Sequence, residues 1–217
     1  FYLRNWDNTV NGEKLSAFFE RCQIHFIPMA NPDGVMLSQQ GLASLDIIKD
    51  EDEKRRRIDF LMPLMKRMND HIAENVWEHD TGWTPPTEGK DDFTYWKNNV
   101  NGVDDHYNFW TPEMKRWRKE VFDANPAFLN GPNYVNYIGE QPFSEKEVKA
   151  VGDYIHELKP NIFLTVHGQG SVLQWRYGFQ RDVDGEKLEQ TADVISERLS
   201  QFMQYKKLTK YIIHCGP

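Results

Sequence analysis

The sequence predicts an α/β protein, in which helices alternate with short apolar runs of strand length. Two apolar runs have the length typical of strands and lie next to turn-forming residues, namely residues 23–28 and 162–166. Two longer segments, 51–77 and 144–158, repeat their apolar residues at steps of three and four, which is typical of one helix face. The 217 residues have the length of one domain, and we find no internal repeat.

The first strand candidate, QIHFIP at residues 23–28, runs into Asn31-Pro32-Asp33-Gly34, a dense turn signal. The helix expected next covers residues 51–77. Its apolar face consists of Ile58, Leu61, Met65, Met68, Ile72 and Val76. Pro63 lies inside this segment, and we expect it to kink or restart the helix.

The second half of the chain repeats this alternation. Residues 79–95 contain two glycines and two prolines and predict a long surface loop, which is often functional. Ser144-Glu145-Lys146-Glu147 matches a capping box that begins a helix, and Pro160 stops that helix. The run IFLTV at 162–166 is apolar throughout, as expected of a central strand buried on both faces. A last helix is expected over about 186–203.

Composition excludes several classes of function. The formal net charge of −7 argues against a nucleic-acid surface, which needs a basic footprint. No apolar run is long enough to span a bilayer, so no membrane span is expected. The first residues lack the apolar core of a signal peptide. Cys22 and Cys215 do not decide the redox compartment, and we favour two unpaired thiols over a disulfide.

Polar residues follow the ends of the expected strands at 23–28 and 162–166 and of a short strand approach at 96–104, and open α/β sheets bind their ligands at such strand ends. These segments are residues 31–34, 102–109 and 167–170. His167 is the sharpest signal, because it follows a buried-strand run and precedes glycines that leave its face open. A lone histidine at such a place is more often a hydrogen-bonded structural residue than a metal ligand. His167 alone therefore does not predict a metal site.

Four segments in a fixed order resemble the zinc carboxypeptidase (M14) metallopeptidase family. They are FIPMANPDGV at 26–35, GVDDHYNF at 102–109, SEKE at 144–147 and VHGQG at 166–170 with Gln174-Trp175 beyond. The family pattern is a strand with NPDG, a GVDLNRNF-like segment, SEPE before a helix, and a strand that ends in the third zinc ligand. The wording around NPDG and H-x-Q-G is closest to the bacterial branch that cleaves γ-D-glutamyl–diaminopimelate bonds in cell-wall peptides.

The resemblance implies a three-layer α-β-α fold with a mostly parallel, mixed central sheet. It implies one carboxypeptidase-like catalytic domain over residues 1–217, incomplete at both ends. His167 would bind Zn²⁺ through a neutral imidazole nitrogen. Asp104 would accept the N–H of another ligating histidine. Lys97 stands where the family often has an arginine that stabilises the developing oxyanion, and lysine supplies the charge without the planar fork.

One pair of residues departs from the family pattern. His106 and Tyr107 stand where the pattern has Asn and Arg, which grip the terminal carboxylate of the substrate. An arginine fork binds a carboxylate through two parallel hydrogen bonds, whereas Tyr107 offers one neutral donor. The departure points to an altered substrate end or to loss of catalysis.

Parts of the family's site are missing from the sequence. The family takes its first two zinc ligands from an H-x-x-E segment before NPDG, and nothing upstream of Asn31 has that form. We therefore expect the chain to begin just after its own first two ligands. His71 to Glu74 is an H-x-x-E on the wrong side of NPDG, which we interpret as an accidental match. The general-base Glu is expected beyond Pro217, and His214 is interpreted as incidental.

The first functional hypothesis is zinc-dependent hydrolysis of a peptide bond, with the remaining ligands and the base outside this stretch. The substrate would be a peptide, with cell-wall stem peptides as the candidate, and the location extracellular or in the cell envelope. The alternative is a non-catalytic module of the same fold that binds peptide or peptidoglycan without cleaving it. A third option, a zinc amidohydrolase for N-acyl amino acids, fits the NPDG and SEKE segments less well.

Overall fold

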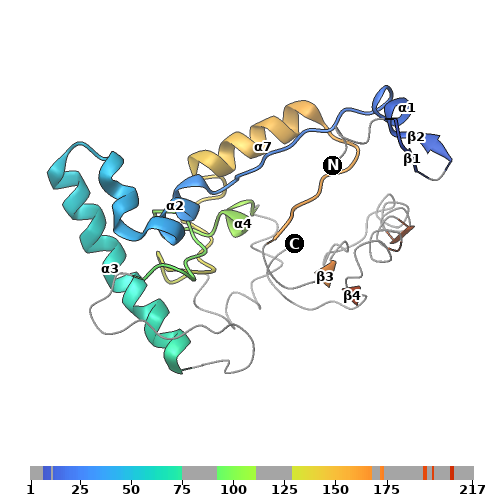
Figure 1. Ribbon diagram of the computed structural model, residues 1–217. Coiled ribbons are helices and arrows are strands. Elements are labelled where there is room, and N and C mark those ends of the chain that lie inside the picture. The colour runs from blue at the N-terminus through green and yellow to red at the C-terminus, as the bar shows by residue number, and fades with distance from the viewer. Residues whose placement is uncertain are drawn as a thin grey trace. The chain divides into compact units, whose positions relative to one another are not determined.

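The structure is a computed structural model (Figure 1), and it describes residues 7–10, 12–74, 92–110, 129–167, 172–173, 193–194, 197 and 206–207. The chain forms two compact units, Phe1–Ala30 and Asn31–Pro217. The first unit contains β1 (Thr9–Val10), β2 (Glu13–Lys14) and α1 (Leu15–Phe19). The β1 and β2 strands pair antiparallel, with Thr9 opposite Lys14. The strand expected at residues 23–28 is not observed, and these residues are exposed.

In the second unit, NPDG begins a helix instead of a free turn. The helix α2 (Pro32–Gln40) has Asn31 as its N-cap, and the Asn31 Oδ1 atom accepts the Gly34 amide at 2.9 Å. Pro32 occupies the first turn, where its missing N–H costs nothing. The 3₁₀ helix η2 (Gly41–Ile47) follows directly and packs against α2.

The predicted long helix is confirmed as α3 (Glu51–Glu74). Its face at Leu61, Met65 and Met68 is buried, as the spacing predicts. These residues belong to a core cluster that consists of Leu37, Leu45, Leu61, Leu64, Met65, Met68, Phe93 and Trp96. The expected restart of the helix at Pro63 is wrong, since α3 is a single helix with Pro63 inside it, whereas the expected kink stays a prediction. Pro63 lies on the exposed side of α3, where water can satisfy the carbonyl that the proline leaves unpaired.

The helix α7 (Lys146–Leu158) is also confirmed, but its predicted capping box is wrong. The N-cap residue is Glu145, and it makes no side-chain cap hydrogen bond. Ser144 Oγ donates to Glu145 Oε1 at 2.8 Å, and the Glu147 carboxylate accepts from Asn99 instead. The helix ends as expected before Pro160, with Lys159 in the left-handed conformation (φ 49°).

The described residues contain little sheet. The strands β3 (Val172–Leu173) and β4 (Lys206–Lys207) pair in parallel, and with the β1–β2 hairpin they are the strands in the described part of the chain. The three-layer sheet is therefore not confirmed. Residues 162–166 are exposed and form no strand, so the prediction that they are buried on both faces is wrong. The helix predicted at 186–203 and most of the loop predicted at 79–95 lie outside the described residues.

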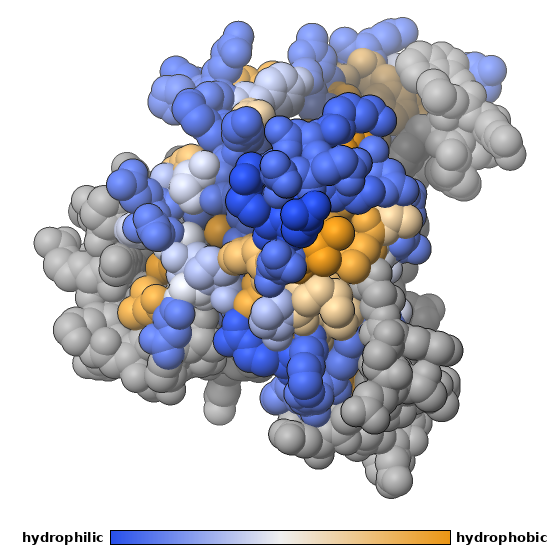
Figure 2. Space-filling model, turned by 90° about the vertical axis from the view of Figure 1, so that its left-hand side faces the viewer, coloured by the Kyte–Doolittle hydropathy of each residue, from blue (hydrophilic) through white to orange (hydrophobic). Residues whose placement is uncertain are grey.

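The surface agrees with the acidic, polar composition. The side on which α3 lies in Figure 1 faces the viewer in Figure 2, where most of the described surface is hydrophilic and apolar areas lie between the hydrophilic ones. None of the helices that the structure describes combines the length and the apolar character that a bilayer span requires.

Candidate functional site

The GVDD segment is folded by the asparagines that precede it. The Asn98 side chain is fully buried and donates to Gly102 O at 3.0 Å and to Asn133 O at 2.9 Å. The Asn99 Oδ1 atom accepts the amides of Asn101 and Val103, both at 3.0 Å. Gly102 has φ +71°, a conformation that side-chain-bearing residues rarely adopt. The run NNVNG thus closes a tight loop and delivers Asp104 to a fixed place.

Another asparagine, Asn108, connects this segment with the start of α7. Asn108 ends the short helix α4 (Asp105–Asn108) and is fully buried. Its Nδ2 atom donates to Ile138 O, Gln141 O and Ser144 Oγ at 2.8–3.0 Å. Its Oδ1 atom accepts the Glu145 amide at 3.2 Å. The GVDDHYNF and SEKE segments are therefore joined through one side chain.

The NPDG segment lies against the same loop. Asn31 Nδ2 donates to Lys97 O at 3.0 Å. A Cβ atom on Gly34 would lie 2.3 Å from Asn98 O, so only glycine fits this approach. Three of the four segments that define the sequence resemblance, which are far apart along the chain, thus lie close together in space.

The five sequence-predicted site residues also form one cluster. Lys97 Nζ lies 2.7 Å from Asp104 Oδ2 and 4.7 Å from the centre of the Tyr107 ring. The His106 ring contacts the Tyr107 ring edge-on, with centroids 5.2 Å apart. The His106 ring also lies edge-on to the His167 ring, with centroids 4.7 Å apart. His167, predicted from the fourth segment, is therefore adjacent to the residues predicted from the second.

Electrostatics favour a neutral imidazole at His167. Partial burial by surrounding atoms lowers the pKa of His167, and the nearby Lys97 ammonium lowers it further, whereas Asp104 opposes the shift. A neutral imidazole is the form that binds metal ions. His167 itself is exposed and accessible to a ligand.

The described residues do not complete a metal site. Within these residues, no group of three His, Cys, Asp or Glu side chains is placed so that it could hold a metal ion. Asp104 Oδ2 accepts from Lys97 Nζ and from the Asn136 amide, the latter at 3.0 Å. The predicted role of Asp104, to accept the N–H of a zinc-ligating histidine, stays a prediction. His71, of the H-x-x-E, lies near Tyr134, with ring centroids 6.3 Å apart.

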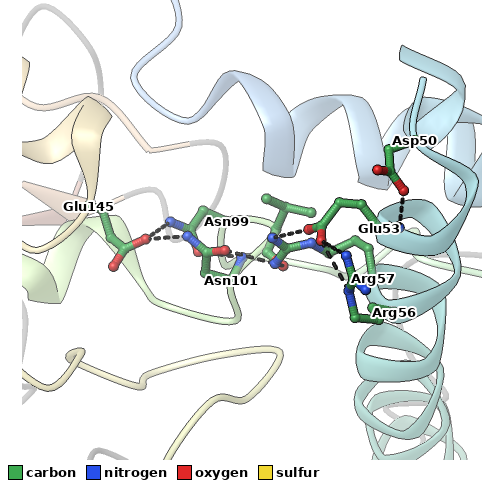
Figure 3. Close-up of polar contacts among 8 residues, drawn as sticks. Asp50, Glu53, Arg56, Arg57, Asn99, Asn101 and Glu145 are labelled. Carbon is green, nitrogen blue, oxygen red and sulfur yellow. Dashed lines mark hydrogen bonds and ion pairs between the residues drawn. The ribbon is translucent and has the colours of Figure 1, made fainter. Parts of the chain in front are cut away.

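A polar network that the sequence did not reveal supports the site (Figure 3). Glu145 Oε2 accepts from Asn99 Nδ2 at 2.7 Å and from Asn101 Nδ2 at 2.8 Å. Asn101 Oδ1 in turn accepts from Arg57 at 2.8 Å, and Arg57 also donates to Val100 O at 3.3 Å. The network connects α3 with the start of α7 through the loop that leads to Asp104.

Sequence reasoning also missed Asp105. This residue is 8% exposed, and neither of its carboxylate oxygens has a hydrogen-bond partner among the described residues. Burial, and next the carboxylate of Glu147, raise the pKa of Asp105 to about 9, with smaller contributions from Asp33, Asp104 and Glu145. One signal was present in the sequence, because Asp105 stands where the GVDLNRNF pattern has an apolar leucine.

The chain matches the zinc carboxypeptidase family over residues 2–214, across both compact units, and it belongs to that family. It is 27% identical over 182 residues to the uncharacterized protein YqgT of Bacillus subtilis, covering 82% of this chain and 36% of that protein. It is 26% identical over 169 residues to the gamma-D-glutamyl-L-diamino acid endopeptidase 1 of Lysinibacillus sphaericus, covering 78% of this chain and 33% of that protein.

These matches confirm the family resemblance seen in the sequence, including the likeness to the γ-D-glutamyl branch. The chain spans about a third of the length of these curated relatives. No solved structure gave a significant match.

Proposed function

We propose that this protein belongs to the catalytic part of a zinc-dependent peptidase and that the cluster around Lys97 and His167 is its active site. The family membership supports hydrolysis of a peptide bond. The single observation that favours this site is the contact between His106 and His167. It brings together two segments about 60 residues apart along the chain, which the chain length alone does not require to be close.

The residues present fit one position of a zinc site. His167 is exposed and its imidazole favours the neutral form. It would supply one nitrogen ligand, and we expect the other ligands and the general base outside the described residues. A bound zinc ion would supply Lewis acidity and a water of lowered pKa.

The neighbouring side chains have defined roles in this proposal. Lys97 supplies the positive charge that stabilises the oxyanion of the tetrahedral intermediate. Asp104 is 2% exposed and fixes the Lys97 ammonium through the 2.7 Å ion pair, so the charge is positioned before the substrate arrives. His106 and Tyr107 lie next to Lys97 and His167, where they would contact the substrate.

The proposed substrates are peptides, with cell-wall stem peptides as the class. The support is the relative named as a γ-D-glutamyl-L-diamino acid endopeptidase. Tyr107 in place of an arginine fork agrees with a substrate that is not held by a free C-terminal carboxylate. A cell-wall substrate would require an extracellular or envelope location.

A non-catalytic binding module is the second candidate. The observation that favours it is the departure at His106 and Tyr107, because neither residue offers the arginine fork with which the family pattern grips the carboxylate of its substrate. Such a module would bind peptide or peptidoglycan with the same residues and leave it intact. Stoichiometric zinc together with hydrolysis would exclude this candidate.

The test uses the parent protein with its zinc content measured by elemental analysis. His167→Ala should lower the zinc content and reduce hydrolysis at least about 100-fold, the scale expected for loss of a catalytic metal. His156→Ala is the matched control, since His156 is an exposed histidine on α7, and it should change neither value. Full activity and zinc content in His167→Ala would refute the assignment. Parallel assays on γ-D-glutamyl stem peptides and on ordinary C-terminal dipeptides choose the substrate class.

A further inference from the structure

Four carboxylates gather where three helices begin. Asp33 lies in the first turn of α2, Asp105 begins α4, and Glu145 and Glu147 stand at the start of α7. Helix N-termini favour negative charge, but each by a modest amount. Asp33, Glu145 and Glu147 all act on Asp105 electrostatically, as does its neighbour Asp104. None of the four forms a salt bridge with a lysine, arginine or histidine of the described residues.

The carboxylates differ in how their oxygens are satisfied. Glu145 accepts hydrogen bonds from Asn99, Asn101 and Ser144. Glu147 accepts one from Asn99. Both oxygens of Asp105 are buried, and no donor from the described part of the chain reaches them. Burial of an ionised carboxylate without a partner costs far more free energy than burial of the neutral acid. The side chain of Asp105 is therefore stable in this place only if its charge is removed.

A proton is the simplest means of removing it. In the described part of the chain, these carboxylates are not placed so that three of them could hold a metal ion together. The nearby cations are already engaged, because Lys97 pairs with Asp104 and Arg57 donates to Asn101.

We propose that Asp105 is a positioning residue that is held as a neutral carboxylic acid, and that its ionisation loosens the segment carrying Lys97, Asp104 and His106. The burial that raises the pKa of Asp105 to about 9 is consistent with this state. The consequence for catalysis rests on the proposed function, whereas the consequence for stability does not.

The backbone shows how ionisation would reach the site. The Asp104 amide donates to Tyr137 O at 2.8 Å, and the Asn108 carbonyl accepts the Phe143 amide at 2.9 Å. Asp105 lies between these two anchors. An ionised Asp105 side chain would have to move toward water, and because Asp105 is the first residue of α4, the helix would move with it. That movement would separate the His106 ring from the His167 ring and the Asp104 carboxylate from the Lys97 ammonium.

The sign of the pH effect follows from the two pKa values of Asp105, about 9 in the folded protein and 3.8 as the ordinary value. Folding takes up a proton at every pH between these values. The stability due to the neutral acid is therefore greatest below about pH 4 and is lost progressively as the pH rises to about 9. The loss amounts to as much as tenfold in the folding equilibrium constant per pH unit.

Asp105→Asn tests this, because asparagine has the shape of the neutral acid and no proton to lose. Urea unfolding of the full chain is measured from about pH 5 to 9. The folding equilibrium constant of Asp105→Asn should rise relative to the wild type by up to tenfold per pH unit. Asp153→Asn is the control, an exposed aspartate on α7 that pairs with Lys149, and its difference from the wild type should stay nearly constant. A constant difference for Asp105→Asn would overturn the proposal.

Two further measurements test for a bound cation and cover the case in which the variant does not fold. If millimolar Ca²⁺ or Mg²⁺ stabilises the wild type near pH 9 but not Asp105→Asn, the cluster binds a cation and the proposal is wrong. If Asp105→Asn does not fold, carbon-13 NMR of the wild-type carboxyl decides. A titration midpoint near pH 9 supports the proposal, and one below about pH 6 overturns it.

Activity separates this proposal from the proposed function. Hydrolysis by the wild type should fall as the pH passes about 9, and Asp105→Asn should extend the activity to higher pH. If the stability result holds and neither protein hydrolyses peptides at any pH, Asp105 is a neutral positioning residue in a protein that is not a peptidase.

Discussion

At the scale of single residues, the ion pair between Lys97 and Asp104 joins side chains of very unequal burial. The Asp104 side chain is 2% exposed, whereas that of Lys97 is 38% exposed. Water therefore screens the lysine but reaches the carboxylate poorly. The partners of the Asp104 carboxylate are the Lys97 ammonium and the Asn136 amide. Removal of the ammonium leaves a buried charge with one neutral donor.

Lys97→Met should therefore destabilise the fold by about 1–3 kcal/mol, less than for a fully buried pair because Lys97 is partly solvated. The control is Lys149→Met, which breaks an exposed pair with Asp153 on α7 and should cost less than about 0.5 kcal/mol. Chemical denaturation near neutral pH measures both. Equal effects of the two substitutions would show that Asp104 is not desolvated as the structure indicates.

The sequence singled out residues that lie together in the structure, whereas their roles at a site stay a prediction. Lys97, Asp104, His106, Tyr107 and His167 were predicted from motif order, and the structure places them in one cluster. The state of Asp105 could not be predicted in the same way. Its pKa depends on Asp33 and Glu147, which are about 72 and 42 residues distant along the chain and close only after folding.

At the scale of elements, Arg57 connects α3 with the loop that precedes Asp104. Its guanidinium donates to Asn101 Oδ1 and to Val100 O, and it also lies 3.8 Å from Glu53 within α3 (Figure 3). Arg56, its neighbour, pairs only locally with Glu53 and is largely exposed. The two arginines therefore offer a matched comparison of a long-range and a local contact.

Arg57→Met keeps the apolar stem of the side chain and removes the hydrogen bonds to the loop. We expect it to destabilise the fold by about 1–2 kcal/mol, the usual range for charged hydrogen bonds that are partly buried. Arg56→Met should cost less than about 0.5 kcal/mol. Hydrogen exchange gives a second readout, since the amides of Val103 and Asp104 should lose protection in Arg57→Met alone. Unchanged protection would contradict the role of Arg57 as a link between these elements.

Helices and strands differed in how far the sequence determined them. The apolar stripe at Leu61, Met65 and Met68 predicted α3 because helical periodicity can be read from a short stretch of sequence. In the structure these three side chains pack in one core cluster with residues of other segments. The capping box failed because a distant residue, Asn99, takes the Glu147 carboxylate. A strand needs a partner strand as well as an apolar run, and residues 162–166 have none in the described part of the chain.

At the scale of the whole molecule, two apolar runs remain exposed. Phe26 and Ile27 are exposed in the first unit, as are Ile162, Phe163 and Val166 in the second. Both runs were predicted as strands, and each leaves backbone groups that a further strand could bind. Contiguous exposed apolar residues of this kind mark association surfaces.

The chain alone should therefore self-associate through these runs, and sedimentation velocity over a concentration series measures this. Phe163→Lys should weaken the association at least about tenfold, because burying one large apolar side chain contributes about 1.5–3 kcal/mol. Phe163 is 52% exposed. Ile47→Lys is the control, since Ile47 is 76% exposed on η2 and outside both runs, and it should leave the association unchanged. A wild-type chain that stays monomeric at high concentration, or an equal effect of both lysines, would show that residues 162–166 are not an association surface.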